Sequence, residues 1–201
     1  MSMFKNFELL QIGDPMLKLR AKEVDIEALQ EGKQDALLKI MRIVANKNNY
    51  FELTAPQMGV LLRVVALKID LFNESYPQDI KDNEVTLMIN PKIKHIEGVS
   101  SSAEYELCTS CKGRTMLVER PDRIFLEYYT PEAIKVQIFV HGYSAHIVQH
   151  AIDHLDGKDF LVLENEEASW YFQSLPDAVY FFTLTEYHTC GRFERTNLSF
   201  F

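Results

Sequence analysis

The stretch QHAIDHLDG, residues 149–157, contains two histidines four positions apart, His150 and His154. The pattern of residues 143–155 predicts a helix that ends at Gly157. On a helix, this spacing puts both imidazoles on one face, one turn apart, where they can bind the same metal ion. A bare pair of histidines is more often structural than ligating. The metal interpretation therefore needs a third ligand.

A candidate third ligand, Cys108, lies in EYELCTSCKG, residues 104–113. A thiolate with two imidazoles would form a three-ligand site with a fourth position for water, whose pKa such a metal lowers to about 7. The simplest alternative for Cys108 is a buried free thiol. Cys111 also forms a C-x-x-C pair with it, which opens redox and structural-zinc alternatives. The segment lacks the strand-to-helix setting of a thioredoxin-type site, and Cys190 alone is a poor fourth zinc ligand.

The rest of the pattern predicts an α+β domain. Residues 33–46 repeat apolar side chains at helical spacing. Alternating segments at 123–129 and 133–140 predict a hairpin around the turn at 130–132. Two further strands are expected at 60–70 and 83–93, the second stopped by Asn90-Pro91. A short helix is expected after the Gly-Asp-Pro turn at 13–15.

Composition limits the class of protein. With 201 residues, 47% hydrophobic and 25% charged, the chain suits one soluble domain. Its apolar runs are too short to span a bilayer, and the pattern of its first residues leads us to expect no secretion signal. A net charge of −8 disfavours nucleic acid and membrane surfaces as partners. Three cysteines are too few for a disulfide framework, so we expect a cytoplasmic protein in a reducing compartment.

Three stretches in this order resemble the signature motifs of peptide deformylases. YFELTAPQMG, residues 50–59, resembles G-h-G-h-A-A-P-Q, where h is apolar; ELCTS, residues 106–110, resembles E-G-C-L-S; and QHAIDH, residues 149–154, resembles Q-H-E-h-D-H. The resemblance extends over about residues 9–160. It implies a deformylase-like domain at 1–160, with antiparallel strands around a central metal-binding helix, and an extension at 161–201 that packs on the same domain.

The resemblance also implies a reaction and a metal. Family members remove the formyl group from the N-terminal formyl-methionine of new polypeptides, typically with Fe²⁺ and often with Zn²⁺, Ni²⁺ or Co²⁺. Carried over residue by residue, it implies one divalent ion bound by Cys108, His150 and His154. The expected partner is a formyl-methionyl peptide or nascent chain.

Four further positions match the motifs. Gln57 and the backbone N–H of Thr109 correspond to the groups that hold the developing oxyanion. Glu106 and Arg120 correspond to a carboxylate and an arginine that support the site as an ion pair. These roles are implied by the resemblance alone.

The sequence departs from the family where catalysis would take place. Ala151 stands where the third motif has the glutamate that passes a proton from water to the leaving amine. Losing such help typically costs about 10²–10⁴ in rate. The sequence therefore predicts a metal protein with weak deformylase activity or none.

The cleft that would admit substrate also differs. Tyr50 and Glu52 replace the two glycines of the first motif, and Leu107 replaces the glycine of the second. Together with Gly59, these residues are predicted to line the cleft, where added side chains would crowd a substrate.

Two alternatives compete with a weak or inactive enzyme. In the first, the protein is an active deformylase or N-acyl hydrolase in which Glu52 replaces the missing base. Against this, Glu52 would be a solvated loop residue or a partner of Lys47 or Arg63. In the second, the protein is a structural or protein-interaction module in which Cys111 closes the metal site as a fourth ligand.

The extension at 161–201 is rich in aromatic residues. VYFFTLTEYH, residues 179–188, has the pattern of a strand, and ASWYFQSL, residues 168–175, that of a short helix. The chain ends in Phe200-Phe201. The tail is expected to dock on its own core or on another chain, which includes a second copy in a homo-oligomer.

Overall fold

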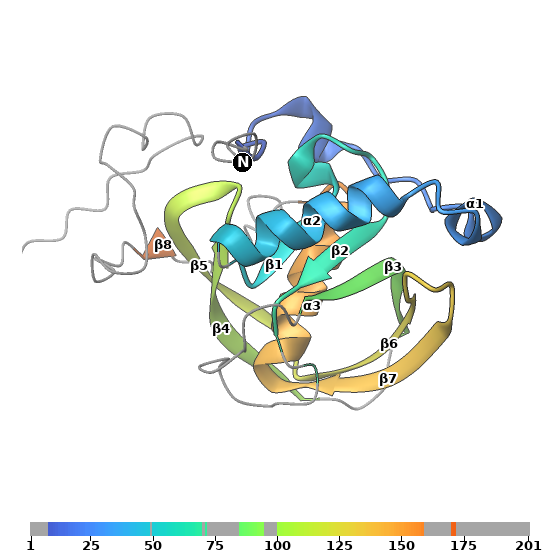
Figure 1. The fold of residues 1–201 in the computed structure, drawn as a ribbon. Helices are drawn as coiled ribbons and strands as arrows, with labels where there is room; N and C mark the ends of the chain where they lie inside the picture. The colour runs from blue at the N-terminus through green and yellow to red at the C-terminus, as the bar shows by residue number, and fades with distance from the viewer. Residues whose placement is uncertain are drawn as a thin grey trace, which may run out of the picture.

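The computed structural model describes residues 8–48, 50–69, 71, 85–94, 100–158 and 170–171, without the side chains of 112–116 and 170–171. Its α+β architecture combines antiparallel sheets with few helices (Figure 1). No helix among these residues is both long and apolar enough to cross a membrane. In chain order the elements, with η for a 3₁₀ helix, are η1 (Pro15–Lys18), α1 (Ile26–Gln30), α2 (Asp35–Asn48), β1 (Glu52–Thr54), η2 (Pro56–Met58), β2 (Val64–Leu67), β3 (Thr86–Lys94), β4 (Ser101–Cys108), β5 (Cys111–Pro121), β6 (Arg123–Tyr129), β7 (Lys135–His141), α3 (Gly142–Leu155) and β8 (Trp170–Tyr171).

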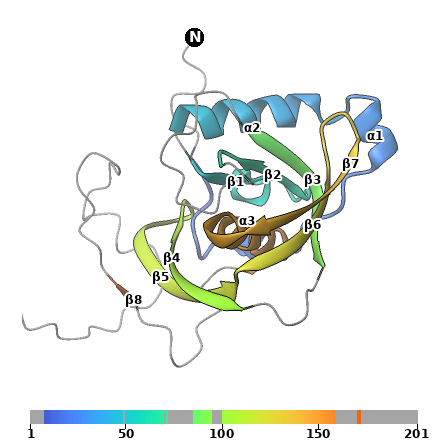
Figure 2. The ribbon, with the colours of Figure 1, turned by 90° about the horizontal axis from the view of Figure 1, so that it is seen from below.

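Two antiparallel sheets surround one helix. The larger sheet has the strand order β1-β2-β3-β6-β7, and the smaller has the order β4-β5-β8. Viewed along its axis in Figure 2, α3 lies between β4 and β5 on one side and β3, β6 and β7 on the other. The predicted central helix is thus confirmed, and both sheets can present side chains to it.

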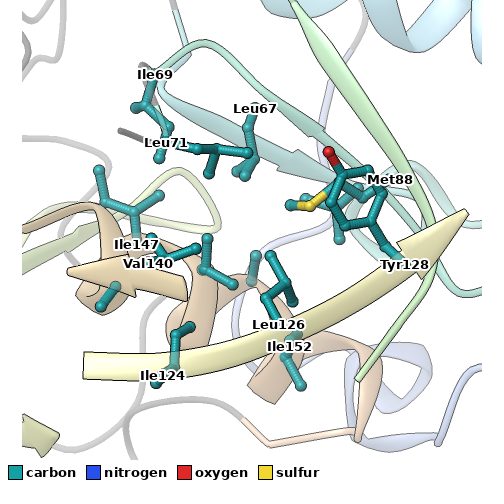
Figure 3. Close-up of a cluster of buried hydrophobic side chains, with 14 of the residues drawn as sticks. Leu67, Ile69, Leu71, Met88, Ile124, Leu126, Tyr128, Val140, Ile147 and Ile152 are labelled. Carbon is teal, nitrogen blue, oxygen red and sulfur yellow. The ribbon is translucent and has the colours of Figure 1, made fainter. Parts of the chain in front are cut away.

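The interior face of α3 is apolar. Ala145, Val148, Ala151, Ile152 and Leu155 pack with side chains of the larger sheet in one buried cluster. Figure 3 shows this cluster, with Leu126, Val140 and Met88 from the sheet facing Ile147 and Ile152 of the helix. Burial of this many aliphatic groups fixes the rotation of α3 about its axis. The same rotation determines where its histidines point.

A close backbone approach fixes the C-terminal end of α3. Gly157 has a left-handed backbone conformation, with φ +72°, and a Cβ on it would lie 2.6 Å from the carbonyl oxygen of Lys18. The N–H of Ala21 donates to the carbonyl of Leu155 at 2.8 Å. Only glycine suits this position. The N-terminal segment is therefore fastened to the end of the helix.

The helix α2 covers the outer face of the larger sheet. Its buried residues Leu38, Met41, Val44 and Ala45 recur at helical spacing and belong to a second cluster with side chains of β1, β2 and β3. In Figure 2, α2 runs over β1 and β2 on the side away from α3. The strands β1 and β2 are therefore buried on both faces, and β1, the edge strand of the larger sheet, also contacts α3.

The structure corrects several predicted boundaries. The strand expected at 83–93 is not stopped by Asn90-Pro91, because β3 continues through them with a register shift between Ile89 and Lys92. Asn90 takes φ +52°, and its amide bonds the N–H and the carbonyl of Val24 at 2.8 Å each. Proline has no N–H for the ladder, and the irregularity accommodates it. The strand expected at 60–70 is shorter, spanning β2 alone.

The first and last predicted elements also differ in detail. The helix after the Gly-Asp-Pro turn is the 3₁₀ helix η1, capped by Asp14. Within the segment expected as a short helix, Trp170 and Tyr171 instead form β8, which pairs with β5. Aromatic residues favour strands when an edge is available. The predicted strand at 179–188 lies outside the described residues, and the division at residue 160 stays a prediction.

Candidate metal centre and adjoining pocket

The three predicted ligands come together at the centre of the fold. Cys108 ends β4, and His150 and His154 stand one turn apart on α3. One potential ligand atom from each of the three lies within 4.8 Å of the others. The Cys108 Sγ is 3.1 Å from the His154 Nε2, and the two imidazole rings are stacked with centroids 5.0 Å apart. All three side chains are buried.

The charge state of the histidines suits a metal. Burial lowers the pKa of His150. Burial and the neighbouring His150 and Arg120 lower the pKa of His154 well below its ordinary value. Both imidazoles are therefore held neutral, which is the form that binds a metal. A thiolate and two neutral imidazoles fit a three-ligand site for a divalent transition metal.

Cys111 is placed differently from Cys108. It begins β5, is buried, and is the cross-strand neighbour of Cys108 in the hairpin. Within the described part of the chain, the group of side chains that could hold an ion comprises Cys108, His150 and His154, without Cys111. The geometry gives no support to the four-ligand site expected in the structural alternative.

A network of charged side chains stands behind His150. Arg120 donates to Glu106 through Nε, and through Nη2 at 2.9 Å, and to Asp153 through Nη1 at 2.7 Å. The Glu106 Oε2 lies 3.6 Å from the His150 Nδ1. Burial opposes ionisation of Glu106, but nearby His146, the Arg120 hydrogen bonds and His150 together lower its pKa to about 2. An ionised carboxylate therefore faces Nδ1, and a histidine held in this way binds a metal through Nε2.

Gln57, the predicted oxyanion donor, is held at both ends of its amide. Its Oε1 accepts from the N–H of Thr54 at 2.8 Å and from the Thr54 hydroxyl at 3.0 Å. Its Nε2 donates to the Thr109 Oγ1 at 2.9 Å. Gln57 is fully buried. The amide is therefore fixed in orientation beside the residue that follows the candidate ligand Cys108.

Glu52 is neither solvated nor paired with Arg63, so both of these expectations are wrong. It lies in β1 and is only 5% exposed, whereas Arg63 donates to Asp156 at 2.6 Å. The Glu52 Oε1 lies 3.4 Å from the His150 Nδ1. Neither Glu52 carboxylate oxygen accepts a hydrogen bond within the described residues. Burial, and then the charge of Glu106, raise the pKa of Glu52 well above its ordinary value.

A pocket opens beside His150. It has an empty volume of about 360 Å³, part of which is open to solvent, and its walls are Phe51, Glu52, Glu106, Leu107, Tyr143, His146, Ile147 and His150. Of the predicted cleft residues, Glu52 and Leu107 line it. Tyr50 and Gly59 are not among its lining residues.

The two other predicted lining residues have structural positions. Tyr50 packs, partly buried, against the cluster under α2. Gly59 follows η2 with φ +80°, and a Cβ there would meet nothing within 4 Å. Its left-handed backbone accounts for the glycine without any role in the pocket.

Sequence reasoning missed two residues of the site. Thr54 holds Gln57, and its signal was available, because it replaces the first alanine in the A-A-P-Q part of the motif. His146 lines the pocket and lies 3.0 Å, through Nε2, from the Ser102 hydroxyl. Its signal was its position four residues before His150, which puts it on the same face of α3.

Comparison with known proteins extends over most of the chain. A family model described as polypeptide deformylase matches residues 7–167. The chain is 34% identical over 160 residues to a peptide deformylase of Desulforudis audaxviator, and the aligned region covers 77% of this chain and 91% of that protein. It is 30% identical over 162 residues to peptide deformylase 1A, chloroplastic/mitochondrial, of Arabidopsis thaliana, and here the aligned region covers 75% of this chain and 58% of that protein.

Solved structures give the same result. A class I type b peptide deformylase from Acinetobacter baumannii with Met-Ala-Ser bound aligns with a TM-score of 0.67 and 28% identity, over 77% of this chain and 95% of that one. A peptide deformylase from Thermotoga maritima aligns with a TM-score of 0.65 and 26% identity, over 78% and 95%. The aligned fold is the one that brings the three motifs together here.

Proposed function

Because the chain belongs to the peptide deformylase family, we propose that it binds one divalent metal ion through Cys108, His150 and His154 and removes the formyl group from peptide N-termini slowly. The family reaction is removal of this group from N-terminal formyl-methionine. The observation that carries the proposal is the buried cluster of three ligand atoms next to Ala151, a residue whose side chain cannot take up or release a proton.

The donor set determines which ions suit the site. One thiolate and two imidazoles favour Fe²⁺ or Zn²⁺, with Ni²⁺ and Co²⁺ as further candidates. When bound, such an ion would polarise the formyl carbonyl and supply hydroxide near neutral pH. Stabilising the developing oxyanion and transferring protons would depend on the groups around the ion.

Two groups of the chain suit the stabilisation of a developing oxyanion. The Gln57 amide nitrogen carries two hydrogens, and Thr109 accepts one of them. The other remains for the formyl oxygen of a substrate, and the backbone N–H of Thr109 is the second proposed donor. Because hydrogen bonds fix Gln57 beforehand, little reorganisation is needed when charge develops.

Proton transfer is the step that this chain supports poorly. Ala151 is 1% exposed and packs in the cluster around α3. No side-chain atom at this position can take a proton from water or give one to the leaving amine. The expected consequence is a rate lower by about 10²–10⁴, or roughly 3–5 kcal/mol of barrier.

The position of Glu52 does not favour it as a replacement base. Its carboxylate lies against Nδ1 of His150, whereas Nε2 is the nitrogen proposed to bind the ion. The imidazole ring would therefore stand between Glu52 and the reacting atoms. We assign Glu52 to the wall of the pocket and not to proton transfer.

The proposed reaction implies a partner but not a compartment. The partner would be a formylated peptide or nascent chain. The tail-mediated homo-oligomer, the absence of nucleic-acid and membrane partners, and the cytoplasmic location stay predictions, and the Arabidopsis relative is named for organelles.

Restoring the lost glutamate tests the proposal. Formate release from formyl-Met-Ala-Ser is measured with the metal-loaded protein and its Ala151→Glu and Ala151→Gln variants. We expect slow release by the natural chain, a gain of about 10²–10⁴ for Ala151→Glu, and no gain for Ala151→Gln, whose side chain matches glutamate in size but has no carboxyl group to take up and release a proton. Rapid release by the natural chain would contradict the claim that it is slow, and equal gains from both variants would contradict the explanation.

A further inference from the structure

The pocket beside His150 is polar on one side. Phe51, Leu107, Tyr143 and Ile147 supply apolar or aromatic surface, and Glu52, Glu106 and His146 supply polar groups. All three polar residues are more than nine-tenths buried. A buried pocket with this many polar groups is poorly suited to a purely apolar occupant.

The two carboxylates of the pocket differ in their partners. Glu106 receives hydrogen bonds from Arg120 on both of its oxygens. Glu52 receives none on either oxygen within the described residues. The His150 Nδ1, 3.4 Å from the Glu52 Oε1, also lies 3.6 Å from the Glu106 Oε2. An Nδ1 carries at most one hydrogen, so it cannot serve both oxygens of Glu52 and Glu106 as well.

His146 adds a second unused polar atom. Its Nε2 is engaged with the Ser102 hydroxyl at 3.0 Å. Its Nδ1 is buried without a hydrogen-bond partner in the described chain, and lies 3.7 Å from the Glu106 Oε1. Three buried polar atoms of pocket-lining residues, two oxygens of Glu52 and one nitrogen of His146, thus lack a hydrogen-bond partner within the described residues.

The location of the pocket says which part of a substrate would enter. His150 is both a proposed metal ligand and a pocket wall. A peptide whose formyl group reaches the ion would place its first residue within one residue's length of that wall. The side chain of this first residue is the group best placed to fill the pocket.

We propose that this pocket selects an N-terminal residue whose side chain donates hydrogen bonds, an amide or an ammonium at the end of a flexible chain, over the thioether of methionine. The inference rests on the proposed function, and it concerns which formylated peptide the site takes. Glu52 is the specificity-determining residue.

The expected selectivity arises from the Glu52 oxygens, which lack a hydrogen-bond donor within the described residues. A methionine side chain in the pocket would offer no hydrogen to the Glu52 oxygens, which are already buried. An amide or ammonium would donate to them instead. Sites built to hydrogen-bond a substrate reject analogues that leave their buried groups unpaired. The expected discrimination is about 10- to 100-fold in affinity.

Calorimetry with tripeptides tests the inference without relying on turnover. The metal-loaded protein is titrated with Met-Ala-Ser, Gln-Ala-Ser and Lys-Ala-Ser, and the Glu52→Met and Glu52→Gln variants are treated alike. We expect the glutamine or lysine peptide to bind at least about 10-fold more tightly than the methionine peptide, and Glu52→Met to reverse the order. Lysine favoured over glutamine would identify charge as the stronger attraction. A matched Glu27→Met variant, changed at an exposed glutamate of α1, should keep the natural order.

Preference of the natural chain for the methionine peptide, or an unchanged order of peptide affinities in both Glu52 variants, would overturn the selectivity while leaving metal content and formate release unaffected. Absence of bound metal together with no formate release from any formyl peptide would overturn the proposed function, and the selectivity with it. Because Glu52→Gln keeps the size of the side chain, its peptide affinities would still test the role of Glu52 if the Glu52→Met variant failed to fold.

Discussion

Two walls meet at the candidate metal centre, and they have opposite characters. The wall formed by α3, β4 and β5 keeps the residue types that a metal site requires, and its charges are paired: the buried Glu106 and the partly buried Asp153 both accept hydrogen bonds from Arg120. The wall formed by β1 holds Glu52, a buried carboxylate with no hydrogen-bond donor within the described residues.

The difference indicates which tasks the chain still supports. Paired charges behind a metal ligand orient its imidazole, and each partner offsets part of the desolvation cost of burying the other. An unpaired buried carboxylate destabilises the fold unless something binds to it. The ligand wall is therefore suited to holding an ion, and the β1 wall to a ligand that donates hydrogen bonds to Glu52.

Breaking the paired wall should have the largest effect on stability. Arg120→Met removes the guanidinium that pairs with both the buried Glu106 and the partly buried Asp153. We expect a loss of about 3–5 kcal/mol in the free energy of unfolding, measured by urea denaturation. Arg20→Met is the matched control, because the Arg20 side chain is 79% exposed, and its effect should stay within about 0.5 kcal/mol.

Removing the unpaired carboxylate of the β1 wall should raise the free energy of unfolding. Glu52→Met replaces a buried carboxylate by an apolar group of similar size and needs no hydrogen bond. We expect the free energy of unfolding without ligand to rise by about 1–3 kcal/mol. Destabilisation of similar size would mean that Glu52 is well partnered in the free protein, and the contrast between the walls would disappear.

A smaller change sharpens the view of Gln57, which spans the two walls. Thr54→Val removes one of the two hydrogen bonds to the Gln57 Oε1, and the Thr54 N–H keeps the other. We expect a loss of about 0.5–1.5 kcal/mol in the free energy of unfolding, because no group is left without a partner. Thr54→Ser keeps the hydroxyl and reports the separate cost of the lost methyl group.

The ligand wall was predictable from the sequence because its signals are local. The spacing of His150 and His154 requires only a helix, and the apolar pattern of the helix fixes which way they point. Cys108 could be added through the order of the motifs. The ion pair of Glu106 and Arg120 was likewise visible as matching positions.

The β1 wall was not predictable in the same way. Whether Glu52 is solvated or buried depends on α2 covering one face of β1 and α3 the other, which no local pattern states. The continuation of β3 through Pro91 depends on Asn90 reaching Val24, far away in the chain. Such long-range contacts override local propensity.

Metal content is the most direct test of the central claim, that one thiolate and two imidazoles form the ion site. The purified chain is compared with Cys108→Ser and Cys111→Ser by elemental analysis after dialysis against metal-free buffer. The account predicts about one equivalent of a divalent transition metal in the natural chain and in Cys111→Ser, and close to none in Cys108→Ser. Retention of the ion by Cys108→Ser, or its loss from Cys111→Ser alone, would contradict the three-ligand site.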